Sequence, residues 1–86
     1  MKRVLKWVVP VDDMNHGIGE GPIVHVGHQG SVDEVAVWTV EEAEGHVPAT
    51  RQAHVVGTGH RFPNDGTVAG SVQVPHGLVW HLVVFP

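Results

Sequence analysis

The chain has 86 residues and a formal net charge of −4 at pH 7, and its five lysines and arginines are scattered along the sequence. It therefore lacks the clustered cations that a nucleic-acid groove needs. With no cysteine it can form neither a disulfide nor a thiolate metal site, and a reducing cytosol would suit it. We expect one β domain over residues 1–86. It should lack a signal peptide, because the apolar stretch after Arg3 is short and ends at Pro10, and a membrane span, because no apolar run reaches about 18 residues.

Clusters of Gly, Pro, Asp and Asn divide the chain into short, valine-rich segments without a helical period. Strands are expected at about residues 3–9, 23–29, 35–40, 50–56, 68–74 and 78–85. The second and third of these are joined closely enough to form an antiparallel hairpin. Residues 11–22 are expected to form a loop, and the acidic run from Glu41 to Gly45 an exposed loop. The pattern predicts an all-β fold, a small antiparallel barrel or compact sandwich of about six short strands.

Alternation along each strand assigns its two faces. In the first strand Leu5, Trp7 and Val9 form the better core face, and Lys6 should reach solvent. In the hairpin the expected inner face holds Val24, Val26, Ala36, Trp38 and Val40. Val35 and Val37 would then lie outside, or under another layer.

The last strand is apolar on both faces, so it must be covered twice. Leu78, Trp80, Leu82 and Val84 are expected to point into the core. The reverse side holds Val79, His81, Val83 and Phe85, and there we predict the contact between subunits of a homo-oligomer.

The segment from Gly57 to Gly66 is a long loop for so small a domain, and such loops are often functional. Thr58, Gly59, His60 and Arg61 are its candidate binding residues, although His60 could instead cap a turn. The Gly57-Thr58-Gly59 sequence does not fit a dinucleotide fingerprint, because position 62 is Phe and no helix is expected to follow. No cofactor is expected.

Eight histidines raise the question of a metal site. His25 and His28 would point to opposite faces of a strand, so the more credible ligand set joins strands through His25, His54 and His81. There is no H-x-H pair and no cysteine, and ordinary polar-face histidines are the safer interpretation. We expect no metal.

Catalytic groups are also scarce. Ser31 and Ser71 are the only serines, and neither lies in a G-x-S-x-G elbow. The neighbouring carboxylates Asp12 and Asp13 fall in a loop, where acids are usually solvated. Because this domain is too small to enclose a catalytic pocket, we expect that the protein is not an enzyme.

Five short segments along the chain carry a resemblance to a known group of proteins. They begin at Lys6-Trp7, Gly21-Pro22, Val37-Trp38, Val55-Val56 (the last running through the G-T-G-H of residues 57–60) and Gly77-Leu78. In this order they resemble a family of small uncharacterised bacteriophage proteins. The resemblance implies a phage origin and a small β fold, and it supplies no catalytic residue.

Two functions are left as hypotheses. The favoured one is a noncatalytic phage accessory protein in the host cytoplasm, a homo-oligomeric binding module that engages a host protein, another phage protein or a small ligand. The alternative is a virion component, such as a capsid decoration or minor structural protein. Neither hypothesis involves nucleic acid or a membrane.

Overall fold

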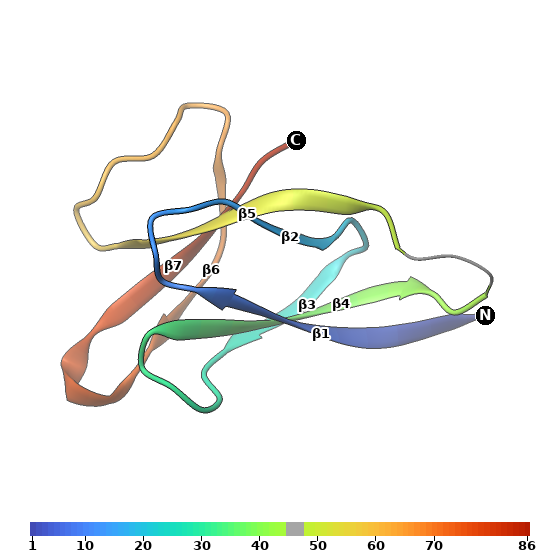
Figure 1. Ribbon diagram of the computed structural model, residues 1–86, viewed down its shortest axis with the longest axis horizontal. Coiled ribbons are helices and arrows are strands. Elements are labelled where there is room, and N and C mark those ends of the chain that lie inside the picture. Colours follow the sequence, from blue (N-terminus) through green and yellow to red (C-terminus); the bar gives the residue numbers. More distant parts are fainter. Residues whose placement is uncertain (45–47) are drawn as a thin grey trace.

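The computed structural model describes residues 1–44 and 48–86, which form seven strands and one short 3₁₀ turn (Figure 1). The elements are β1 (Lys2–Pro10), β2 (His16–Gly19), β3 (Ile23–Gly27), β4 (Glu34–Glu42), β5 (Thr50–Gly57), β6 (Thr67–Gln73), η1 (Pro75–Gly77) and β7 (Val79–Val84). The all-β prediction is confirmed, with one strand more than expected.

The strands make two antiparallel sheets, one of three strands in the order β1-β4-β3 and one of four in the order β2-β5-β7-β6. They are not closed into a barrel, so the compact sandwich is the correct one of the two predicted forms. Along one side β3 and β6 approach each other, and both carry a register shift there. Gly70 in β6 permits this approach, because a Cβ there would come within 2.7 Å of Val26 Cγ2.

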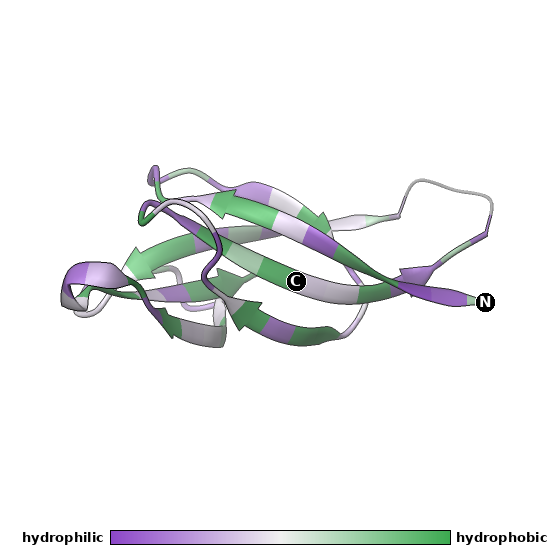
Figure 2. Ribbon diagram, turned by 90° about the horizontal axis from the view of Figure 1, so that it is seen from below, coloured by the Kyte–Doolittle hydropathy of each residue, from purple (hydrophilic) through white to green (hydrophobic). Residues whose placement is uncertain are grey.

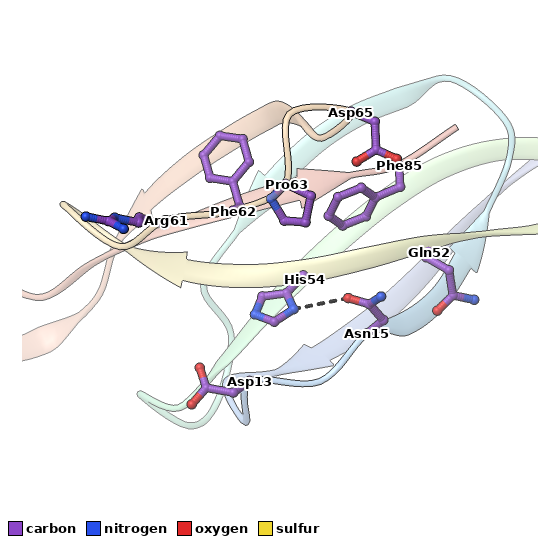
Figure 3. A pocket seen from close by; sticks show the side chains of 9 residues that line it. All are labelled: Asp13, Asn15, Gln52, His54, Arg61, Phe62, Pro63, Asp65 and Phe85. Atoms are coloured by element: carbon purple, nitrogen blue, oxygen red, sulfur yellow. Dashed lines mark hydrogen bonds between the residues drawn. The ribbon is translucent and has the colours of Figure 1, made fainter.

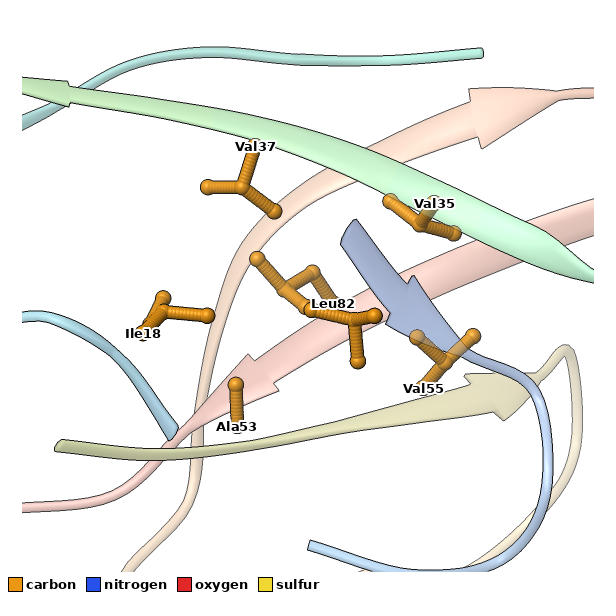
Figure 4. Packing of buried hydrophobic residues seen from close by; sticks show 7 residues of the cluster. Ile18, Val35, Val37, Ala53, Val55 and Leu82 are labelled. Atoms are coloured by element: carbon orange, nitrogen blue, oxygen red, sulfur yellow. The ribbon is translucent and has the colours of Figure 1, made fainter. Parts of the chain in front are cut away.

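Both sheets contribute valine-rich inner faces to the core. Figure 2 colours the strands by the hydropathy of their residues. Figure 4 shows Leu82 of β7 among side chains from both sheets. The fully or nearly fully buried cluster consists of Val9, Ile18, Val35, Val37, Ala53, Val55 and Leu82. Burying a side chain of this size contributes roughly 1.5–3 kcal/mol, so these few residues matter to the whole fold.

The predicted inner face of the hairpin was wrong except at Val26, which packs against the core. Val35 and Val37 are fully buried and face the opposite sheet, whereas Val24 is 55% exposed. The direct partners of Val35 and Val37 in β1 are Val9 and Trp7, which were correctly placed on the core face. Residues 35–40 are apolar on both sides, so their partner strand decides which side is buried.

The loop predicted over residues 11–22 contains β2. This strand pairs with β5 and places Ile18, which is fully buried, in the core. Its sequence, His16-Gly-Ile-Gly19, has only one large apolar residue and no alternation, so no local signal identifies it as a strand.

The acidic run was not an exposed loop either, because β4 continues through Glu42 and Glu41 is only 8% exposed. The Glu41 carboxylate accepts hydrogen bonds from the Gly21 backbone N–H, at 3.0 Å for the nearer oxygen. Arg51 donates from Nη2 to the Gly21 carbonyl oxygen at 2.9 Å. The bond from the Gly21 N–H thus gives the buried Glu41 carboxylate a hydrogen-bond partner. Gly45, the end of the run, lies outside the described residues.

Candidate functional site

The segment between β5 and β6, residues 58–66, lies over the outer face of β7. Val83 points to that face and is fully buried. A Cβ added at Gly66 would come within 2.6 Å of Val83, 2.9 Å of Phe85 and 3.0 Å of Phe62, so these three side chains surround Gly66 closely. The cover that the terminal strand requires is therefore supplied by the chain's own loop.

This arrangement corrects part of the predicted subunit contact. Val83 is enclosed within its own chain and offers no surface to a partner. Val79, His81 and Phe85 keep partial exposure, but two of these three also have partners in the same chain. His81 is hydrogen-bonded by two hydroxyls, and Phe85 packs beside Gly66.

The loop begins with a tight turn held by the backbone. The His60 N–H donates to the Gly57 carbonyl oxygen at 3.1 Å, and the Gly57 N–H donates to His60 Nδ1 at 3.3 Å. Gly59 has φ +88°, which favours glycine. His60 thus has the turn-capping role that the sequence left open as its alternative.

A second tie fixes the loop to the sheet through His81. Its Nε2 lies 2.8 Å from Thr58 Oγ1, and its Nδ1 lies 2.6 Å from Ser71 Oγ. In a catalytic triad a carboxylate holds the imidazole and stabilises its cation, but here a neutral hydroxyl occupies each side of the ring. The arrangement joins the loop to β6 and β7, and it lacks the charged partner that would activate Ser71.

The four predicted binding residues are divided between two hollows. Thr58, Gly59 and His60 line a smaller hollow of about 210 Å³, together with Val68 and His81. Arg61 lines a larger hollow of about 630 Å³ on the other side of the loop. The latter volume lies within the roughly 300–1,000 Å³ range of ligand sites.

The larger hollow is built from four parts of the chain: the β1–β2 connection, β5, the loop, and the residue after β7 (Figure 3). Its lining consists of Asp13, Asn15, Gln52, His54, Arg61, Phe62, Pro63, Asp65 and Phe85. Figure 3 shows Pro63 between the rings of Phe62 and Phe85, which gives one side of the hollow a strip of apolar rings. The other side carries amide and imidazole groups.

One hydrogen bond fixes the polar side. His54 Nδ1 lies 3.1 Å from Asn15 Oδ1. Because an amide oxygen only accepts, Nδ1 must carry the proton, and in the neutral imidazole Nε2 is then an acceptor. The Asn15 amide retains its NH₂ donors. A donor group and an acceptor group thus lie side by side.

A neighbouring contact orders the β1–β2 connection. His16 Nε2 donates to both carboxylate oxygens of Asp12, at 2.8 and 3.0 Å. This hydrogen bond is the main cause that lowers the pKa of Asp12 below its ordinary value. Asp13, the next residue, has φ +60° and lines the larger hollow.

The sequence matches, over residues 1–85, the family model described as a domain of unknown function, DUF7352. The chain belongs to this family. No curated protein and no solved structure matches it. The resemblance to an uncharacterised family is confirmed to this extent, and the phage origin stays a prediction.

Sequence reasoning missed most of the larger hollow of this DUF7352 chain. Asn15, Gln52, His54 and Asp65 come from three segments, and no motif connects them. Phe85 was predicted on the outer face, but as a subunit contact. The one available signal was the length of the 57–66 loop, which correctly drew attention to this side of the sheet.

The described ranges contain neither a cluster of metal-ligating side chains nor a membrane-spanning helix. Within residues 1–44 and 48–86 no group of three or more His, Cys, Asp or Glu could hold a metal ion. The candidate set is separated, since His25 lies beside the Trp38 ring in the three-stranded sheet while His54 and His81 lie in the other sheet. No helix in these same ranges is long and apolar enough to cross a membrane.

Proposed function

We propose that this chain is a noncatalytic binding module, and that the larger hollow is its binding site. The single observation that supports this most is the construction of the hollow: about 630 Å³, lined by a strip of apolar rings on one side and by polar groups on the other. Sites for small ligands combine apolar walls with a few placed polar groups in the same way.

The proposal includes an origin and a place of action. On the short motifs from Lys6-Trp7 to the terminal strand, we infer a phage accessory protein that acts in the host cytoplasm on a host protein, another phage protein or a small ligand. His81 holds the loop to the sheet through the hydroxyls of Thr58 and Ser71, and among the described residues no carboxylate is hydrogen-bonded to this imidazole. The absence of that carboxylate supports the noncatalytic part of the proposal.

Self-association is proposed through the outer face of the three-stranded sheet. Val4 and Val8 are 58% and 48% exposed there, although valine is more often buried. A second copy that covers these side chains would replace the terminal-strand contact, which the loop already occupies. Val8→Lys should shift sedimentation at micromolar concentration to the monomer. Val68→Lys, at a site of 47% exposure on the other sheet, should leave the oligomer intact.

The same exposed valines favour a second candidate, a virion component such as a capsid decoration protein, because a shell protein needs lateral contacts between copies. Mass spectrometry of purified particles separates the two candidates. High copy number in particles would contradict the accessory protein, and absence from particles would contradict the virion component.

The binding site itself is tested by amide shift mapping with a small-molecule library that contains neutral, cationic and anionic members. We expect shifts that concentrate on Gln52, His54 and Phe62. A library that produces no shift at the hollow, with the protein folded, would contradict the proposed function.

A further inference from the structure

We propose that the larger hollow takes a neutral saccharide, with one face of a pyranose ring on the apolar strip and its hydroxyls on the amide and imidazole groups opposite. This inference rests on the proposed function, and it adds the chemical class of the ligand. Three observations carry it: the strip of rings, the donor and acceptor pattern, and the charge balance.

The apolar strip matches the C–H face of a pyranose. Phe62 is 37% exposed and Phe85 is partly exposed, so each ring keeps surface that a ligand could cover. Pro63 lies between them and continues the surface (Figure 3). Such a strip excludes water from an apolar face, but it cannot satisfy hydroxyls, which must find partners elsewhere.

The polar side offers these partners in the required combination. The hydrogen bond from His54 to Asn15 leaves an acceptor at His54 Nε2 and donors at the Asn15 amide. Gln52 adds a further exposed amide, which has both functions. Each saccharide hydroxyl also donates and accepts, and two neighbouring hydroxyls can therefore bond to this pair at once.

The charges favour a neutral ligand over an ion. Asp13 and Asp65 contribute two carboxylates and Arg61 one guanidinium, and among the described residues none of the three makes an ion pair. A cation such as a lysine side chain would meet the carboxylates but also Arg61 and the Asn15 amide donors. A phosphate would be attracted by Arg61 but repelled by the two carboxylates, which outnumber it.

The test uses saturation-transfer NMR and amide shift mapping with methyl glycosides of glucose, galactose, mannose and N-acetylglucosamine at millimolar concentration. Nα-acetyl-lysine methylamide, which keeps its side-chain ammonium, is the cationic probe, and cyclohexanol is the ring with a single hydroxyl. We expect at least one glycoside to bind at the hollow more tightly than either of these probes.

Paired variants distinguish the loss of a ligand contact from an effect on folding. Gln52→Ala should weaken the glycoside about fivefold, since a hydrogen bond is worth about 1 kcal/mol, whereas Gln73→Ala, at an exposed position in β6 outside the hollow, should not change it. Phe85→Leu retains apolar cover for Val83 but removes the flat ring, and should weaken binding about threefold to tenfold.

Each outcome has a distinct meaning. If no glycoside binds while the lysine probe shifts the residues of the hollow, the saccharide is wrong and the binding site stands. If none of the probes shifts these residues, the proposed function fails as well. Binding that Gln52→Ala and Phe85→Leu leave unchanged would also overturn the saccharide assignment, because it would take place elsewhere.

Discussion

Phe62→Ala tests whether the loop is part of the core rather than a surface connection. About three-fifths of the Phe62 side chain is buried, and full burial of such a side chain contributes roughly 1.5–3 kcal/mol, so its loss alone removes about 1–2 kcal/mol. The fully buried Val83 would also lose cover. We expect the free energy of unfolding to fall by about 2 kcal/mol in total.

Urea unfolding followed by tryptophan fluorescence measures this change, and in a domain of this size it corresponds to a fall in Tm of roughly 8–16 °C. Phe62→Leu should retain most of the cover and lose less than about 1 kcal/mol. Gln73→Ala, at an exposed strand position, should stay within about 0.5 kcal/mol of the wild type. If Phe62→Ala is also within that limit, the loop does not cover the terminal strand.

Three further predictions concern other parts of the fold. Gly21→Ala should destabilise by about 3 kcal/mol or more, because its Cβ would overlap a backbone carbonyl oxygen; Gly59→Ala, with open space but a φ of +88°, should cost only about 1 kcal/mol in the same urea titration. Trp80→Ala should cost about 3 kcal/mol, since the ring is partly buried and its N–H is hydrogen-bonded, and an unchanged Tm would contradict this. The lowered pKa of Asp12 implies a contribution to stability that is present above the unfolded pKa and is lost as the pH falls through the folded pKa. His16→Gln should raise the pKa of the Asp12 carboxyl, as measured by NMR. An unchanged pKa in this variant would exclude the His16 contact as the cause of the shift.

The sequence was most informative where a strand has one apolar and one polar face. The boundaries of β5 and β6 agree with prediction within one residue, and the core face of β1 was correctly assigned. In residues 35–40 the alternation of side chains does not identify the core face. They are apolar on both sides, and only the pairing of Val35 with Val9 determines which side is buried.

Prediction from local sequence was also wrong where a distant part of the chain stabilises the element. Four residues with two glycines become β2 because Ile18 fills the core and β5 provides the ladder. Glu41 belongs to a strand because Arg3 of β1 continues the ladder there and the Gly21 backbone N–H donates to its carboxylate. Periodicity over a short window contains none of this information.

The terminal strand connects the fold to the site. Its two apolar faces correctly predicted a second cover, but nothing in the alternation could identify the cover as Phe62 and its loop rather than another subunit. The same ring that covers Val83 also lines the larger hollow, so loop order and ligand binding depend on one contact. Substitutions of Phe62 should therefore reduce stability and binding together, whereas Gln52→Ala should reduce binding alone. A Phe62→Ala protein that unfolds more easily but binds as the wild type does would show that the ordered loop is not required for the site.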